Sequence, residues 1–295
     1  MRRAWRIALI GLGVLTLVLL GQMGARYLGL LTPRDTPEER SALLSPFYKV
    51  YLPDSGQGPF PTALLASGCD GPHDNMARWA GMLNEQGWAA VMVDSHAPRD
   101  YLDFQVWRLI CAGQIFTGTE RAGDLAVALE DVRGMAFADP DRLLLFGASH
   151  GGWAVMDLLS QAATPRPPQG LSRWPGDPQA RGLAGVLGAL VAYPYCGPGS
   201  LAARQGWAAE IPVEMILVRD DEITDEQACL DIATGQTAVR PVAVTVLENA
   251  THGFDQQERE ALSTLEFSPE ATTTALGLGR DFVTRISAPE SAPGN

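Results

Sequence analysis

The sequence predicts an α/β fold, in which helices pack on both faces of a mostly parallel β-sheet. Short apolar runs alternate with segments of helical periodicity, as in chains that build strand–helix–strand units. The central runs are largely apolar, which is typical of parallel strands that are covered on both faces. The strand candidates are residues 48–52, 62–66, 89–93, 142–146, 185–192, 213–218 and 242–247.

Segments of helical periodicity separate several of these strand candidates. Residues 76–83 carry apolar side chains at helical spacing; Asp74 can cap this helix and Gly87 can end it. A second pattern, over residues 125–132, places apolar side chains on one face before the strand candidate 142–146. The sequence therefore supplies the alternation that a parallel sheet needs between its strands.

Composition and length fit one large domain with terminal extensions. The chain has 295 residues, of which 46% are hydrophobic and 19% charged, as in ordinary globular proteins. We expect a membrane-anchoring segment at 1–30, a polar linker at 31–45, the α/β domain at 46–286 and a disordered tail at 287–295. The formal net charge of −12 argues against nucleic acid as a partner of the folded part.

The N-terminus has the composition of an export signal or a membrane anchor. Arg2, Arg3 and Arg6 precede an uncharged stretch from Ile7 to Ala25. As a helix these 19 residues span about 28 Å, close to the thickness of a bilayer's hydrocarbon core. We favour a retained signal-anchor over a cleaved signal peptide, since the small residues needed for cleavage are poorly supplied. In both cases the arginines stay in the cytoplasm and the domain lies on the extracytoplasmic side, periplasmic or extracellular; a cleaved signal would make it a secreted protein.

The candidate nucleophile is Ser149, in the motif Gly147-Ala148-Ser149-His150-Gly151 directly after a predicted strand. A strand that runs into Gly-x-Ser-x-Gly and then into a helix is typical of a nucleophile elbow. The turn is so tight that the residues two before and two after the serine must be small. Ser149 then lies at a helix N-terminus, where free N–H groups favour developing negative charge.

A serine nucleophile needs a base and an acid that orients it. In this strand–turn–helix architecture the chain order is serine, acid, histidine, and His252 is the histidine that satisfies it. The acid should follow the preceding strand, where Asp220, Asp221 and Glu222 stand in a row. The residue pattern by itself does not choose between the two aspartates.

Several separated motifs resemble those of the dienelactone hydrolase family, which belongs to the α/β-hydrolases. The resemblance covers residues 46–286 and implies an α/β-hydrolase fold. With a serine at position 149, the chain resembles the family members that use serine in place of cysteine. The motifs are Ser67-Gly68-Cys69-Asp70-Gly71, Val93-Asp94-Ser95-His96-Ala97-Pro98-Arg99, Gly147–Gly152, Tyr193-Pro194-Tyr195-Cys196, Asp221–Cys229 and His252-Gly253-Phe254-Asp255.

The resemblance assigns further roles. The family pattern places the catalytic aspartate eight residues before a cysteine, which selects Asp221 from Cys229, although departures from the pattern keep Asp220 open. It implies an oxyanion hole made by the backbone N–H groups of Cys69 and His150. In the archetypal enzymes two arginines bind the substrate carboxylate. Arg99 could be one of them, and Gln256 stands at the position of the other.

The family topology also bears on the cysteines. The sequence has four, which could equally be buried thiols or two disulfides. The loops that carry Cys69 and Cys111 follow adjacent strands in this topology, as do the loops that carry Cys196 and Cys229. The resemblance therefore implies the pairs 69–111 and 196–229, which an exported domain permits.

These features predict a serine esterase that cleaves an ester, thioester or lactone of a small molecule. The sequence has no metal-binding motif and no dinucleotide fingerprint, so we expect no metal and no cofactor. The alternatives are a prolyl oligopeptidase-like peptidase and a catalytically silent, membrane-tethered binding protein. The loops 95–118, 164–181 and 197–210 are expected to shape the pocket.

Overall fold

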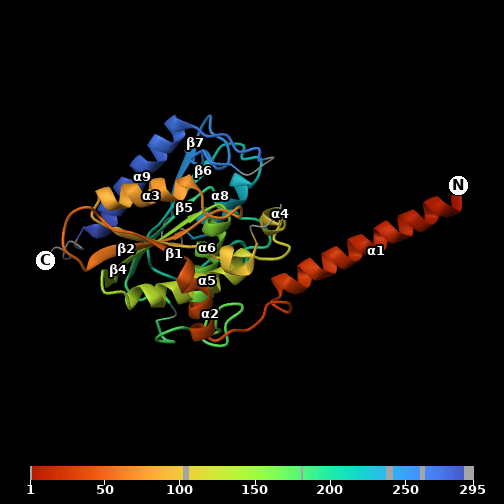
Figure 1. Ribbon diagram of the computed structural model, residues 1–295. Coiled ribbons are helices and arrows are strands. Elements are labelled where there is room, and N and C mark those ends of the chain that lie inside the picture. The colour runs from red at the N-terminus through yellow and green to blue at the C-terminus, as the bar shows by residue number, and fades with distance from the viewer. Residues whose placement is uncertain (1, 102–105, 181, 237–241, 260–262, 289–295) are drawn as a thin grey trace.

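A computed structural model describes all residues except 1, 102–105, 181, 237–241, 260–262 and 289–295 (Figure 1). Most of the predicted tail therefore lies outside the described residues. The described chain contains a mixed sheet of seven strands in the order β1-β3-β2-β4-β5-β6-β7, in which β1 is antiparallel to β3 and the other pairs are parallel. The strands are β1 (Tyr48–Tyr51), β2 (Phe60–Ala66), β3 (Ala89–Val93), β4 (Ala138–Ala148), β5 (Val186–Ala192), β6 (Val213–Val218) and β7 (Val242–Leu247).

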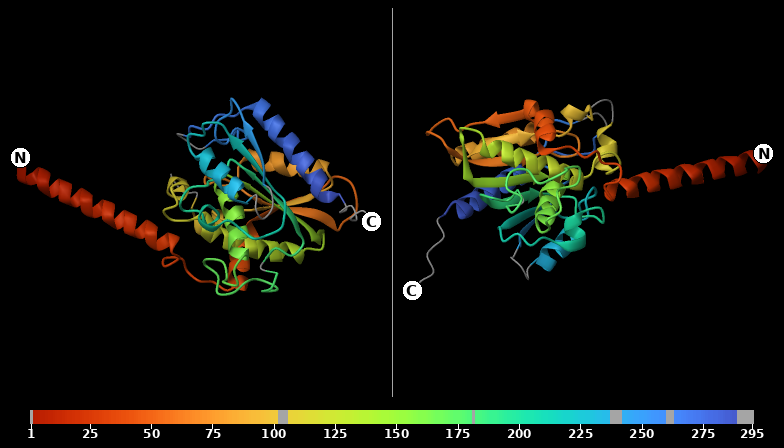
Figure 2. Two further views of the ribbon diagram at one scale, coloured as in Figure 1. Left: turned by 180° about the vertical axis from the view of Figure 1, so that it is seen from behind. Right: turned by 90° about the horizontal axis from the view of Figure 1, so that it is seen from below.

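All seven strand predictions are confirmed. The largest difference is in β4, which starts four residues earlier and ends two residues later than expected. Helices cover both faces of the sheet (Figures 1 and 2). On one face, α3 and α9 bury an apolar cluster with β2, β4 and β5; on the other, α5, α6 and α8 bury a second. The helices are α1 (Arg2–Tyr27), α2 (Pro37–Leu44), α3 (Asp74–Glu85), α4 (Trp107–Cys111), α5 (Gly118–Arg133), α6 (His150–Ala162), α7 (Leu201–Gln205), α8 (Glu226–Gln236) and α9 (Pro269–Ser287).

The N-terminal apolar stretch forms α1, which projects from the domain as a single rod (Figure 1). Residues Arg3–Tyr27 have a mean hydropathy of 2.1 in their most apolar window, and none of that window is buried against the domain. By length and composition this helix can cross a membrane.

Two local expectations were wrong. Residues 31–45, expected as a linker, contain α2, which starts with a capping box: the Thr36 hydroxyl accepts from the Glu39 N–H, and the Glu39 carboxylate accepts from the Thr36 N–H. Asp74 does not cap α3 but is its first residue. Its carboxylate instead accepts hydrogen bonds from the backbone N–H groups of Gln257 and Glu258.

A buried ionic cluster fastens α2 and the loop after β3 to α5. The Asp124 carboxylate is fully buried and binds Arg99 through two hydrogen bonds of 3.0 and 2.9 Å, while Arg40 of α2 binds it from the other side. Burial alone would raise the pKa of Asp124, but the two guanidinium charges outweigh it and hold the pKa below its ordinary value. The carboxylate is therefore ionised at neutral pH, and its charge is matched by its partners.

Replacing Asp124 should destabilise the domain in a pH-dependent way. Asp124→Asn removes the carboxylate that pairs with Arg99 and leaves Arg40 paired with Asp35 alone, which we expect to lower the free energy of unfolding by about 3 kcal/mol at pH 7. Because the folded pKa is depressed, this contribution is present above the unfolded pKa of about 3.9 and is lost as the pH falls through the folded value.

Urea unfolding of both proteins between pH 7 and pH 3 tests this expectation. The difference between wild type and Asp124→Asn should shrink toward the acid end of the series. A difference that stays constant over this range would contradict the assigned role of the ionised carboxylate.

Candidate active site

Ser149 occupies the turn between β4 and α6, as the elbow motif predicts. Its backbone has φ 50° and ψ −114°, a conformation that L-residues rarely adopt. The turn closes because two neighbours lack side chains: a Cβ at Gly151 would collide with the Ala66 carbonyl, and one at Gly147 would collide with the Gly151 backbone. The hydroxyl is thereby presented at the carboxyl edge of the sheet.

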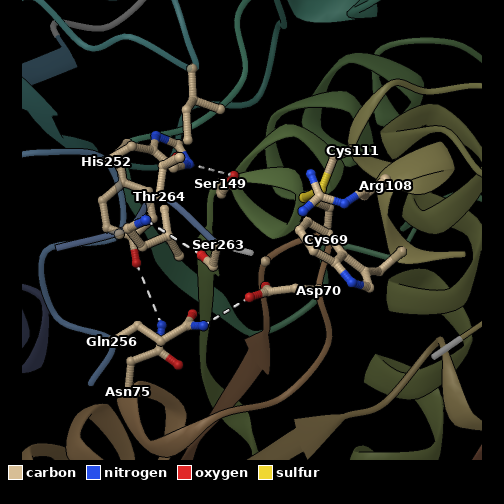
Figure 3. Close-up of a pocket in the computed structure, with 16 residues that line it drawn as sticks. Cys69, Asp70, Asn75, Arg108, Cys111, Ser149, His252, Gln256, Ser263 and Thr264 are labelled. Atoms are coloured by element: carbon tan, nitrogen blue, oxygen red, sulfur yellow. Dashed lines mark hydrogen bonds between the residues drawn. A yellow bond between two sulfur atoms is a disulfide. The ribbon is translucent and has the colours of Figure 1, made fainter. Parts of the chain in front are cut away.

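Three side chains from three different segments meet at this edge. The Nε2 atom of His252 lies 2.8 Å from Ser149 Oγ, and its Nδ1 atom lies 2.8 Å from Asp221 Oδ2. Figure 3 shows the imidazole facing the Ser149 hydroxyl. Asp221 follows β6 and His252 follows β7, so the carboxyl ends of three parallel strands bring these groups together. This is the geometry of a nucleophile, a base and an orienting acid.

The structure separates the two candidate acids. Asp221 Oδ1 accepts hydrogen bonds from the backbone N–H groups of Ile223 and Thr224, each at 2.9 Å, and the side chain points to His252. Burial would raise the pKa of Asp221, but the hydrogen bond and charge of His252 outweigh it, and the pKa is lowered. Asp220 is exposed and has φ 54°. The backbone turns there, so the next side chain, that of Asp221, faces the imidazole.

A buried carboxylate, Asp255, anchors the loop that carries His252. It accepts hydrogen bonds from the Tyr193 hydroxyl at 2.5 Å and from Trp79 Nε1 at 2.7 Å, and burial raises its pKa. The Tyr193 ring also packs edge-on against His252, with 4.8 Å between ring centroids. The sequence showed the motif around Asp255 but not this role, because its partners lie 62 and 176 residues away along the chain.

The two expected oxyanion donors flank Ser149. His150 is the first residue of α6, and Cys69 belongs to the loop after β2, where Gly68 approaches the Ser149 side chain. Within the described part of the chain, neither backbone N–H donates a hydrogen bond to another residue. Both donors are therefore available to a ligand, although their use by an oxyanion is a proposal.

The side chain of His150 lies behind the site and is not part of its proton path. Its Nε2 atom is 3.2 Å from the Phe116 carbonyl and its Nδ1 atom is 3.3 Å from an Arg121 nitrogen. Burial, followed by the Arg121 charge, lowers the pKa of His150 to about 3, so the ring is neutral. Arg121, which sequence reasoning missed, is fully buried and donates to the Ser67 carbonyl at 2.7 Å. It thereby braces the loop that carries Cys69.

A cavity of about 180 Å³ opens above Ser149. One wall is polar, where Gln256 donates to the Asp70 carboxylate at 2.7 Å (Figure 3). Burial would raise the pKa of Asp70, but its hydrogen bonds with His73 and Gln256 outweigh it and lower the pKa. The cavity is lined by Gly68, Cys69, Asp70, Asn75, Trp107, Arg108, Cys111, Ser149, Tyr193, Ile223, His252, Gly253, Gln256, Ser263, Thr264 and Leu265.

Of the three loops expected to shape the pocket, only 95–118 contributes described residues, namely Trp107, Arg108 and Cys111. Arg99 does not hold the substrate-binding position that was expected. Its guanidinium is held by Asp124 and the Ser95 carbonyl and packs over the Phe116 ring, and it is absent from the described cavity lining. The buried carboxylate, which sequence alone did not reveal, draws this arginine into the domain.

Both expected disulfides are present. Cys69–Cys111 joins the loop after β2 to the end of α4 and forms part of the cavity wall (Figure 3). Cys196–Cys229 joins the loop after β5 to α8. Among the described residues, no group of three or more His, Cys, Asp or Glu side chains is arranged to hold a metal ion.

Comparison with solved structures finds a similar fold in dienelactone hydrolase-like proteins and esterases. No protein-family model and no curated protein matches the chain. A putative dienelactone hydrolase from Klebsiella pneumoniae subsp. pneumoniae MGH 78578 is similar in structure, with a TM-score of 0.58, 15% identity, and coverage of 81% of this chain and 92% of that one. Thermogutta terrifontis esterase 2 phosphorylated by paraoxon gives a TM-score of 0.55 and 16% identity, covering 84% and 90%.

A dienelactone hydrolase-like promiscuous phosphotriesterase from metagenomic libraries gives a TM-score of 0.55 at 14% identity, covering 81% of this chain and 92% of that one. The resemblance to dienelactone hydrolases is thus confirmed at the level of the fold. At these identities the likeness shows the fold alone.

The elbow should not tolerate a methyl group at position 151. Gly151→Ala forces the Ala66 carbonyl and α6 apart, so we expect a loss of stability of about 3 kcal/mol or failure to fold. Gly81→Ala is the matched control, because Gly81 lies in α3 with open space around the added Cβ. That change should be neutral or stabilising by up to about 1 kcal/mol. Thermal unfolding of the two variants compares them, and equal midpoints would contradict the close packing at the elbow.

Proposed function

We propose that the protein is a serine hydrolase of the dienelactone hydrolase-like type, which cleaves an ester, thioester or lactone through an acyl-enzyme. The observation that carries the proposal is the hydrogen-bonded series from Asp221 through His252 to Ser149 at the mouth of a cavity. The proteins of similar structure are described as esterases and hydrolases, which supports the same class of reaction. The chain's own residues supply each part of the chemistry.

The reaction begins when Ser149 Oγ attacks the substrate's carbonyl carbon while His252 Nε2 takes the hydroxyl proton. Asp221 holds the proton on Nδ1 and stabilises the imidazolium that forms. The N–H groups of Cys69 and His150 bind the tetrahedral oxyanion, each contributing about 3 kcal/mol in comparable sites. The tetrahedral intermediate then collapses: the C–O or C–S bond to the leaving group breaks while His252 Nε2 gives its proton to the departing oxygen or sulfur, and the acyl group remains on Ser149.

Water completes the cycle. His252 takes a proton from a water molecule, whose oxygen attacks the acyl carbon; the second tetrahedral intermediate collapses, releases the carboxylic acid and returns the proton to Ser149 Oγ. The three side chains are almost completely buried, which limits solvent around the imidazole. The residues proposed as catalytic require neither a metal nor an organic cofactor for these steps.

The surroundings of the cavity bear on its substrates. The ionised Asp70 carboxylate lies in its wall, and Arg99 is committed to Asp124. Arg99 and Gln256 therefore do not reproduce the two arginines that bind a substrate carboxylate in the archetypal enzymes. We propose that the substrate is a small molecule without a charged group on its acyl or leaving part.

We further propose that α1 anchors the domain to a membrane, with the domain on the extracytoplasmic side. The arginines at the start of α1 favour a cytoplasmic N-terminus. Two disulfides fit an oxidising compartment. Removal of α1 by a signal peptidase is the alternative, and the N-terminal sequence of the mature protein decides between the two.

Substitutions of the two adjacent aspartates should separate catalysis from folding. Asp221→Ala removes the group that orients His252 and should lower kcat for p-nitrophenyl ester hydrolysis by about 10⁴. Asp220→Asn removes the exposed carboxylate one residue away, keeps a side chain that tolerates φ 54°, and should leave the rate close to wild type. Equal losses in both variants would contradict Asp221 as the acid.

Ser149→Ala should abolish labelling by a fluorophosphonate probe, which the intact protein should show. An intact, folded protein that neither reacts with the probe nor hydrolyses p-nitrophenyl esters would favour the silent binding protein instead.

A further inference from the structure

The membrane-spanning candidate α1 is docked on the domain rather than joined to it by a free tether. The Tyr27 ring packs against Trp153 of α6, with 6.2 Å between centroids. It sits where Gly113 and Gly199 leave room, because a Cβ at either glycine would collide with it. The Arg26 guanidinium pairs with the mostly buried Glu120 carboxylate at 3.0 Å. The end of α1 is therefore fixed relative to the domain.

The docking place is the carboxyl edge of the sheet, where the proposed active site lies. Trp153 is one turn of α6 beyond Ser149, and Gly113 follows the disulfide-bonded Cys111 of the cavity wall by two residues. Figures 1 and 2 show α1 leaving the domain on the side of α4, opposite the end of α9, and all views agree.

This attachment sets the distance between the domain and a bilayer. The uncharged stretch of α1 ends at Ala25, and the next residue, Arg26, already binds the domain. A helix that places this stretch in the hydrocarbon core leaves no spacer between the bilayer and the carboxyl edge. The carboxyl edge, where the cavity lies, is then the part of the domain next to the membrane surface.

Exposed apolar side chains gather on the same edge. Leu28 and Leu30 follow α1 and are each 73% exposed, Leu109 of α4 is 43% exposed, and Ile223, which lines the cavity, is 50% exposed. Such side chains in contact with lipid would be removed from water, which is favourable. Their continuity with α1 identifies the lipid bilayer as the surface that covers them.

We propose that the carboxyl edge rests on the bilayer spanned by α1, and that the substrate is an amphiphilic ester that enters the cavity from the lipid phase. This inference rests on the proposed ester hydrolysis and names the substrate class of the same site. A long-chain ester partitions into the bilayer, because its methylene groups are expelled from water. An active site at the membrane surface receives it without transfer of the chain through water.

The test uses the full chain in phosphatidylcholine vesicles with two esters, bilayer-partitioned p-nitrophenyl palmitate and water-soluble p-nitrophenyl acetate. Leu109→Glu places a charge on the face that meets the lipid and should lower palmitate hydrolysis at least tenfold, with the acetate rate within twofold of wild type. Leu30→Glu is a second variant with the same expected pattern.

Leu52→Glu is the matched control. Leu52 is 48% exposed, and it follows Tyr51, which pairs with Ala90 near the start of β3, so it lies toward the amino edge of the sheet. It should alter neither rate. Equal effects of Leu109→Glu and Leu52→Glu on the palmitate rate, or no effect of Leu109→Glu and Leu30→Glu, would overturn the proposal. An acetate rate close to wild type shows that a variant is folded.

A second measurement does not depend on catalysis. Phosphatidylcholine with a photoactivatable acyl chain should crosslink peptides that contain residues 28–31 and 107–111, and should spare residues 48–52. Crosslinks absent from the first two peptides, or equal over all three, would overturn the inference. If the wild-type protein shows this crosslinking pattern but hydrolyses neither ester, the proposed hydrolysis is refuted and the bilayer contact remains supported.

Discussion

The turn between β4 and α6 holds Ser149 at φ 50°, and it closes only because Gly147 and Gly151 have no side chains to keep β2, β4 and α6 apart. Every other group at the site is placed relative to this turn. Parallel strands end at one edge, so the loops after β6 and β7 deliver Asp221 and His252 to the same point. The close approach of backbones at the elbow thus fixes the position of the Ser149 hydroxyl, and the sheet fixes the positions of Asp221 and His252.

Buried charges hold the loops around that edge. Asp255 ties the His252 loop to Tyr193 and Trp79, Arg121 braces the loop that carries Cys69, and Asp124 gathers Arg40 and Arg99. Each charge is satisfied by hydrogen bonds or an opposite charge, because an unpaired buried ion would cost several kcal/mol. These groups do not contact a substrate in the cavity, but they limit the movement of the residues that do.

The cavity and α1 share a common wall. Cys111 joins α4 to the loop of the proposed oxyanion donor, and two residues later Gly113 receives the Tyr27 ring. The side chains that would bind substrate and the helix that would cross the membrane are therefore parts of one packed unit. Under the proposal that α1 crosses a bilayer, this arrangement would give the domain a fixed orientation on it.

The sequence by itself predicted the strands and singled out Ser149 and His252, which the structure brings together, because their signals are local: apolar runs, two glycines around a serine, and a histidine in the required chain order. It left Asp220 and Asp221 open, since a backbone turn at Asp220 decides which side chain faces His252. Only the tertiary structure revealed Asp255 and Arg121, and it moved Arg99 from substrate to Asp124. The separations along the chain are 176 residues for Asp255 and Trp79, 54 for Arg121 and Ser67, and 25 for Arg99 and Asp124, and no local pattern encodes them.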